Sequence, residues 1–422
     1  MFLFNRKFSF FVLDSKGTDF ILLFTEGHEL QHAIPKALVT TGQSGRLSLY
    51  YFADNMKQLL NIVRHQNEYS LNHNVYMTDG MKKAGVELNG TVRTSVYGLS
   101  YNNYSGDGYS GGYLAIPSPF LSRKYIVPSF NVYDTLLSQS MIAVTPTESR
   151  TIVNMHLKMA SGSITYKNRT YSQNDTLTIV FDKHDTFEIS HTSDLTGTQI
   201  PSSSPVAVVS GNKCNYIHFI AGCNTFIEMV LPLEQLDTTY VIPYIATRVD
   251  NTVRVISTND TTINIWYNNQ HMTKHIKTRD FLDFPHHDIS YVNAIDEVNV
   301  MIYPHEIRGG KGDAFMMTIH GINQYLHHYD FVVPRGFTSY ISITVQSDGI
   351  NGFILDGSSF SIGNVYTISG TIGRYSSFVK NITYGEHRIT HSRNIRFGLW
   401  VYGNAHYDAY GYPAGIAFKT RH

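Results

Sequence analysis

The chain has 422 residues, of which 42% are hydrophobic, 13% aromatic and 16% charged. This length exceeds what one hydrophobic core usually supports, so two to four domains are expected, and the hydrophobic content argues against wholesale disorder. Lys plus Arg and Asp plus Glu both number 33, and this zero net charge removes the electrostatic case for nucleic-acid binding.

The N-terminal residues only partly match a signal peptide. Arg6 and Lys7 precede the apolar run 8–13, but this run is shorter than a usual hydrophobic region and no small-residue cleavage site follows. No later apolar stretch is long enough to span a bilayer. We expect residues 1–16 to be an N-terminal extension, either an unusual mature start, part of a fragment or a degraded signal peptide.

The first predicted elements are two strands and a short helix. Residues 20–24 and 47–52 are apolar and aromatic runs that favour strands. In residues 54–64 the apolar positions recur at helical spacing after a candidate N-cap, Asp54, so a short helix is expected there.

A strand followed by glycine recurs further along the chain. Residues 92–98 and 206–211 contain several β-branched side chains, which suit a pleated sheet. Gly211, the last residue of the second run, predicts a turn that ends the strand. Residues 298–303 and 397–403 are weaker copies.

A short apolar run closed by proline also recurs. It is Tyr125-Ile-Val-Pro128, then Tyr240-Val-Ile-Pro243, then Phe331-Val-Val-Pro334, and residues 20–23 resemble a first copy without the proline. Proline cannot donate a backbone hydrogen bond, so each strand should end there or lie at a sheet edge. The copies start roughly 100 residues apart, which suits a β-sandwich of about six to eight strands.

The recurring motifs predict an all-β protein built from four tandem β-sandwich-like units. The links between copies are short, so neighbouring units should pack against one another. The expected boundaries of the units are 17–118, 119–232, 233–328 and 329–422.

The two cysteines and the glycosylation sequons indicate an oxidising compartment. Cys214 and Cys223 are the only cysteines, and a hairpin-type disulfide between them would contribute roughly 2–3 kcal/mol. The alternatives are two buried free thiols or half of a metal site. Six Asn-x-Ser/Thr sequons in turn-like positions favour secretion and glycosylation. They begin at Asn89, Asn103, Asn168, Asn174, Asn259 and Asn381.

No stretch carries a catalytic signature, and we expect no catalytic residue, metal site or cofactor. The glycine-rich run 106–112 lacks the Gly-Lys-[Ser/Thr] ending of a phosphate loop. Residues 286–288 and 327–328 contain adjacent histidines, which would form a metal site only if both pairs converged. Asp182, Asp185 and Glu188 are candidate glycosidase carboxylates, but acidic residues near strand ends are usually solvated turns.

The tyrosine-rich segment 400–412 is the best sequence candidate for ligand contact. Tyrosine gives a rigid amphipathic surface, and neighbouring glycines can expose it. The alternative is a tyrosine-packed final strand pair. The candidate contacts are Trp400, Tyr402, Tyr407, Tyr410 and Tyr412.

Several stretches carry a resemblance to a known family, and the last two of them are the most specific. They are residues 95–98, 112–117, 125–128, 194–198, 205–214, 351–357, 397–403 and 407–415. They resemble the amino-terminal domain family of the IgG Fc-binding protein, a secreted, mucus-associated glycoprotein. The resemblance extends from residue 17 to residue 415 and implies an extracellular β-rich binding or adhesion module without catalytic residues. It also implies that Cys214 and Cys223 match the family's cysteine pair.

The sequence therefore predicts a secreted, glycosylated, non-catalytic module that binds extracellular glycoproteins or glycans in mucus or matrix. Immunoglobulin Fc is an expected partner only if the source has immunoglobulins. The alternatives are a secreted carbohydrate-active enzyme and a purely structural matrix component.

Overall fold

In the computed structural model, every regular element among the described residues is a β-strand or a short 3-10 helix, which confirms the all-β prediction. The predicted extension 1–16 and the sequon at Asn103 lie outside the described residues. The structure describes residues 18–25, 33–40, 45–54, 56–62, 68–71, 76–77, 79–91, 94–102, 109–218 and 222–419.

The first part of the chain forms two four-stranded antiparallel sheets, in the orders β1-β9-β4-β5 and β11-β10-β3-β6. Strands β2 and β7 pair in parallel with each other, and β8 joins a later sheet. The bounds are β1 (Thr18–Leu22), β2 (Phe24–Thr25), β3 (Ala33–Thr40), β4 (Gly45–Tyr51), β5 (Met56–Ile62), β6 (Glu68–Ser70), β7 (Tyr76–Met77), β8 (Gly80–Lys82), β9 (Val86–Gly90), β10 (Ser95–Asn102) and β11 (Gly111–Leu114).

An eight-stranded sheet follows, in the order β17-β14-β19-β13-β18-β8, and β12 and β20 also pair with β19. Strands β15 and β16 form a separate hairpin. The bounds are η2 (Ser118–Phe120), β12 (Ser122–Ile126), β13 (Ser140–Pro146), β14 (Thr151–His156), β15 (Ile164–Tyr166), β16 (Arg169–Tyr171), β17 (Thr176–Phe181), β18 (Thr186–His191), β19 (Gln199–Asn215) and β20 (Asn224–Met229).

The next sheet has seven strands, in the order β24-β23-β26-β22-β25, with β21 and β27 also paired to β26. The bounds are η3 (Leu233–Gln235), β21 (Asp237–Ile242), β22 (Asn251–Ser257), β23 (Thr261–Tyr267), β24 (Gln270–Ile276), β25 (Phe281–His286), β26 (Ser290–Pro304) and β27 (Met317–Ile319).

Two sheets complete the fold, in the orders β28-β34-β30-β31 and β32-β33-β29-β35-β36. The bounds are η4 (Ile322–Gln324), β28 (His328–Val333), β29 (Thr338–Gln346), η5 (Ser347–Gly349), β30 (Phe353–Leu355), β31 (Ser358–Ser359), β32 (Val365–Gly370), β33 (Gly373–Ile382), β34 (Gly385–His391), β35 (Gly398–Ala405) and β36 (Asp408–Pro413).

Two long strands, β19 and β26, curl their sheets into half-barrels. The first half of β19 pairs with β12 and β14, and the second half pairs with β13 and β20. Strand β26 does the same with β21 and β23 and then with β22 and β27. Because different strands pair with its two halves, each long strand belongs to both sides of its half-barrel, and the two sides enclose one apolar interior.

Two local predictions were wrong. Residues 56–62 form strand β5 and not a helix, because antiparallel pairing with β4 outweighs the helical spacing of the apolar residues. Gly211 does not end its strand, since β19 continues to Asn215. A Cβ at Gly211 would lie 1.9 Å from the backbone oxygen of Phe226, so glycine is needed there for close approach of β20.

The proline-closed motifs behave as predicted. Strand β21 ends at Ile242 and β28 ends at Val333, each directly before its proline, while β12 ends two residues before Pro128. These prolines therefore mark strand ends, as expected for a residue without a backbone N–H.

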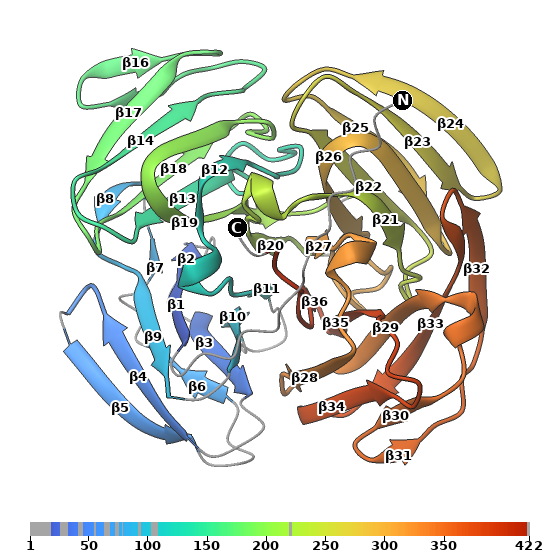
Figure 1. Cartoon of the computed structure of the whole chain (residues 1–422). Helices are drawn as coiled ribbons and strands as arrows, with labels where there is room; N and C mark the ends of the chain where they lie inside the picture. Colours follow the sequence, from blue (N-terminus) through green and yellow to red (C-terminus); the bar gives the residue numbers. More distant parts are fainter. Residues whose placement is uncertain are drawn as a thin grey trace, which may run out of the picture.

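Four inner strands, β11, β20, β27 and β36, lie near one another at the centre of the molecule, with the sheets arranged around them (Figure 1). The side chain of Asn224, the first residue of β20, connects them. Its Oδ1 accepts a hydrogen bond from the Ser110 N–H at 2.6 Å, and its Nδ2 donates to the Ala314 and Ala409 backbone oxygens at 2.9 and 2.8 Å. One buried amide thus joins segments from four sheets.

Candidate binding pocket

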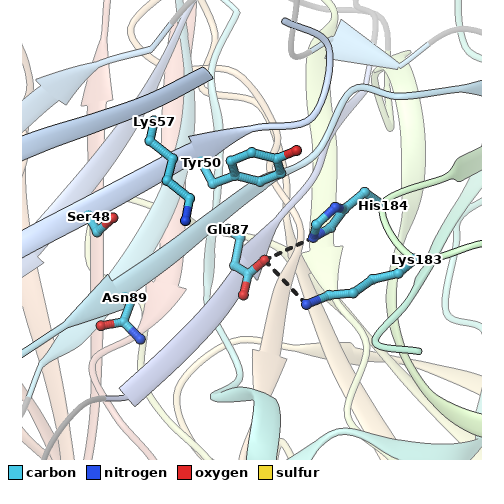
Figure 2. A pocket seen from close by; sticks show the side chains of 7 residues that line it. All are labelled: Ser48, Tyr50, Lys57, Glu87, Asn89, Lys183 and His184. Atoms are coloured by element: carbon cyan, nitrogen blue, oxygen red, sulfur yellow. Dashed lines mark hydrogen bonds and ion pairs between the residues drawn. The ribbon is translucent and has the colours of Figure 1, made fainter. Parts of the chain in front are cut away.

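A pocket of about 490 Å³ lies where the β4-β5-β9 face meets the hairpin between β17 and β18 (Figure 2). Its volume falls within the range of about 300–1,000 Å³ that is usual for small-molecule sites. The lining residues are Ser48, Tyr50, Lys57, Glu87, Asn89, Lys183 and His184.

One wall of the pocket is the solvent-facing side of a sheet. Side chains alternate between the two faces of a strand, so residues two apart share a face. Glu87 and Asn89 are two apart on β9, and their register partners on β4 are Tyr50 and Ser48. Lys57 on β5 pairs with Tyr50. The register of three strands therefore gathers these five side chains on one surface.

The other wall is the tip of the hairpin at residues 182–185. The Asp185 N–H donates to the Asp182 backbone oxygen at 3.0 Å, and the Asp182 N–H donates to the Asp185 carboxylate at 3.0 Å. His184 has a φ of 72°, in the left-handed region that few residues other than glycine adopt. This turn holds Lys183 and His184 at the hairpin tip, where they face the β9 wall.

A shared sheet fixes the two walls relative to each other. Strand β8 lies four residues before β9 in the chain but pairs with β18 of the eight-stranded sheet. The Ala84 N–H between β8 and β9 also donates to Thr186 Oγ1 at 3.3 Å. The hairpin that carries His184 is therefore anchored beside the strand that carries Glu87.

Glu87 is the polar contact between the walls. Its Oε2 lies 3.0 Å from His184 Nε2 and 3.9 Å from Lys183 Nζ (Figure 2). The His184 ring packs 4.8 Å from the Tyr50 ring and 4.3 Å from that of Phe52. These contacts fix the imidazole from two sides, while the ammonium groups of Lys57 and Lys183 remain near the solvent.

The tyrosine-rich tail is placed mostly inside the protein. Trp400, Tyr402, Tyr410 and Tyr412 are fully buried, and only Tyr407, at the turn between β35 and β36, is partly exposed. The Trp400 Nε1–H donates to the Thr318 backbone oxygen at 3.0 Å, and the Tyr412 hydroxyl donates to the Val332 oxygen at 2.7 Å. The tail therefore fills the core, as the alternative of a packed final strand pair predicts.

Burial of these tyrosines leaves their hydroxyls neutral. Desolvation raises the pKa of Tyr402, Tyr410 and Tyr412 above the ordinary tyrosine value. In this conformation these hydroxyls act as internal hydrogen-bonding groups and do not contact solvent.

Cys214 and Cys223 form the predicted disulfide. The segment between them is held by Glu306, whose carboxylate accepts hydrogen bonds from the N–H groups of Ile217 and His218. The bridge joins the end of β19 to the residue before the inner strand β20, and this carboxylate holds residues 217 and 218.

The five described sequon asparagines all have exposed side chains and are therefore accessible to a glycan, and one of them, Asn89, lines the pocket. Asn168 and Asn174 also have left-handed φ values of 60° and 68°, typical of turns. The five are Asn89, Asn168, Asn174, Asn259 and Asn381.

The other sequence candidates do not come together. His286 is fully buried, with its ring nitrogens 2.7 Å from Ser290 Oγ and 2.9 Å from the Pro243 backbone oxygen. His327 instead contacts the Asn394 backbone oxygen at 2.6 Å. Within the described residues, no group of three His, Cys, Asp or Glu side chains has the arrangement of a metal site.

The carboxyls considered for glycosidase chemistry have separate structural roles. Asp182 and Asp185 close the hairpin turn, and Glu188 is buried within β18. Of the glycine-rich run 106–112, residues 109–112 are described and lead into β11, with Tyr109 partly buried and the other three buried.

Sequence reasoning missed the pocket because its residues come from three separate stretches. The only available signal was the Asp182–Asp185 segment, which reads as a turn. A turn gives no indication that Lys183 and His184 face β9.

A family model described as IgGFc binding protein matches residues 111–403. The chain belongs to this family. The human IgGFc-binding protein is 25% identical over 266 residues, which cover 60% of this chain and 5% of that protein. The chain therefore spans only a small part of the length of this relative. The pocket lies largely before the matched residues, on β4, β5 and β9.

Solved structures give only distant matches. The major pilin of Streptococcus pyogenes is 7% identical, over 69% of this chain and 97% of the pilin, with a TM-score of 0.16. A Ca²⁺-stabilised ice-binding adhesin of an Antarctic bacterium is 8% identical, over 95% and 99% of the two chains, with a TM-score of 0.12. Scores this low support no common architecture. In the described part of the chain, no helix has the length and apolar character needed to cross a membrane.

Proposed function

We propose that this chain is a secreted, glycosylated binding module that recognises extracellular proteins or glycans without catalysis. Membership of the IgGFc-binding family carries the proposal, and the pocket beside β9 supplies a site of suitable size. The disulfide and the exposed sequon asparagines fit an extracellular protein, in mucus or matrix. The human relative is named for Fc binding, so immunoglobulin Fc is a candidate partner where the source has immunoglobulins.

The test is a screen of the secreted chain against immobilised glycans and extracellular proteins, including immunoglobulin Fc, with and without enzymatic deglycosylation. We expect saturable binding of a discrete ligand and no turnover of it. Hydrolysis of a glycan that one carboxyl substitution abolishes would instead identify an enzyme. Self-association with no discrete ligand would identify a structural component of the matrix.

We also propose that the chain is organised as four tandem units with the boundaries 17–118, 119–232, 233–328 and 329–422. The support is a tyrosine contact that recurs at the start of three of these units. The hydroxyls of Tyr125 and Tyr240 each donate at 2.5 Å to a backbone oxygen in a later strand of the same unit. The Tyr329 hydroxyl donates at 2.5 Å to the backbone oxygen of Phe397, the residue directly before β35. Each hydroxyl also accepts a hydrogen bond from the N–H three residues earlier.

Replacing these tyrosines tests the division into units. If the three contacts are equivalent, Tyr125→Phe, Tyr240→Phe and Tyr329→Phe will each lower the free energy of unfolding by about 1–2 kcal/mol in chemical denaturation. A cost confined to one position would contradict the equivalence.

A further inference from the structure

We propose that the pocket beside β9 binds a sugar that bears one carboxylate or sulfate group, with Lys57 and Lys183 pairing to that anion. The inference rests on the proposed binding function and specifies the ligand class of the same site. It follows from the charges in the pocket, the other groups in its walls and the way His184 is held.

The two lysines are available to an anionic ligand. Among the described residues, Lys57 has no carboxylate within ion-pair distance, and its Nζ lies 6.0 Å from the centre of the Tyr50 ring. Lys183 reaches Glu87 only at 3.9 Å, and its side chain is 46% exposed. An exposed pair at this distance contributes little to stability, so an incoming anion can replace it at small cost.

The charge of the pocket matches a single anion. Leaving the His184 ring aside, the two lysines and Glu87 give the lining a net charge of one positive unit. A polyphosphate would bring several negative charges close to the Glu87 carboxylate, which repels them. The balanced charge of the whole chain likewise offers no extended basic surface to a polyanion.

The remaining lining groups suit a sugar. Ser48, Glu87 and Asn89 place hydroxyl, carboxylate and amide groups along one face of the sheet, where they can exchange hydrogen bonds with sugar hydroxyls. Tyr50 adds an aromatic ring between Lys57 and His184 (Figure 2). Sugars present both hydroxyl edges and apolar C–H faces, so a wall with both kinds of group fits them.

The pocket is formed before a ligand arrives. His184 adopts a left-handed φ and is held by Glu87 and by ring contacts with Tyr50 and Phe52. Uncommon backbone conformations persist where the surrounding contacts determine them, and they concentrate at functional sites. A preformed wall lowers the ordering cost of binding.

The test is a calorimetric titration of the full chain with each of four compounds: 3′-sialyllactose, 6-sulfo-N-acetyllactosamine, lactose and sodium sulfate. At least one acidic sugar is expected to bind at least tenfold more tightly than lactose and sodium sulfate, and the two acidic arms separate carboxylate from sulfate recognition. Lys57→Ala and Lys183→Ala should each weaken that binding about tenfold, as expected for loss of one charge-assisted contact.

Lys274→Ala is the matched control, because Lys274 is an exposed lysine on β24, outside the pocket. It should leave the affinity unchanged, and all three variants should keep the thermal unfolding temperature of the parent chain. Equal binding of lactose, equal binding of free sulfate, absence of acidic-sugar binding, or losses at Lys274 equal to those at Lys57 would each overturn the inference. If the screen against immobilised glycans and extracellular proteins finds a ligand that the lysine variants bind normally, only the assignment of the ligand to this pocket fails. If the screen finds no ligand, the proposed binding function fails.

Discussion

Replacing Asn224 with alanine should destabilise the whole molecule. This one side chain makes three buried hydrogen bonds, to Ser110, Ala314 and Ala409, and its removal leaves three main-chain groups without that partner. A buried hydrogen bond contributes about 1 kcal/mol net, and a stranded buried group costs about 1–3 kcal/mol. We expect Asn224→Ala to lower the free energy of unfolding by about 3–5 kcal/mol.

The measurement is urea denaturation followed by tryptophan fluorescence, since Trp400 is buried within the same core. Asn154→Ala is the control, because Asn154 accepts an exposed hydrogen bond from Thr178, and its loss should cost less than about 0.5 kcal/mol. Asn224→Asp keeps the acceptor for Ser110 but loses both donated bonds, so its cost should be substantial. If Asn224→Ala costs no more than Asn154→Ala, the central amide does not connect the sheets as argued.

Three further predictions concern titrating groups and the pocket. Burial lowers the pKa of His286 to about 4, so as the pH falls below about 6.5 the unfolded chain takes up a proton that the folded chain does not. The free energy of unfolding should therefore fall by about 2 kcal/mol between pH 7 and pH 5 because of this residue. His286→Gln should reduce the slope of that free energy against pH, and an unchanged slope would contradict the argument. Burial, together with Asp408, raises the pKa of Asp313 to about 8, so this carboxyl lowers the free energy of unfolding as the pH rises from about 4 towards 8. Asp313→Asn should therefore raise the unfolding temperature more at pH 8 than at pH 5. An equal increase at both pH values would refute the pKa shift. A glycan on Asn89 would stand in the pocket wall. Thr91→Ala removes the sequon and keeps the Asn89 side chain, so in a glycosylating host it should increase the affinity for the acidic sugar several-fold in the same calorimetric titration. Equal affinity with and without the glycan would show that the glycan does not cover the site.

The sequence predicts those features of the fold that depend on local chemistry. Proline at position 243 ends β21 because it lacks an N–H, and the disulfide follows from two cysteines close together in the chain. Gly211 was misread because glycine serves both turns and close contacts, and only the position of Phe226 across the sheet decides between them. The helical spacing in 54–64 was overruled in the same way by pairing with β4.

The candidate site depends on long-range placement, which a single sequence does not contain. Tyr402 and Tyr410 have the composition of a recognition surface, but the register of β35 and β36 turns them into the core. Lys183 and His184 have no distinguishing sequence context, and they face Glu87 only because β8 crosses into the sheet of β18. Residue type was therefore a poor guide to the site, and strand register decides it.

The last strand has a consequence for how the polypeptide is made. The Tyr97 hydroxyl donates to the Ala414 backbone oxygen at 2.6 Å across a sequence separation of 317 residues, and Gly112 lies against Tyr412. A ribosome must therefore release the chain through residue 414 before its earliest sheets acquire their final neighbours. During that interval the apolar surface around Tyr97 stays uncovered, so nascent molecules that stop before residue 414 should be retained by chaperones, and expression boundaries should include β36.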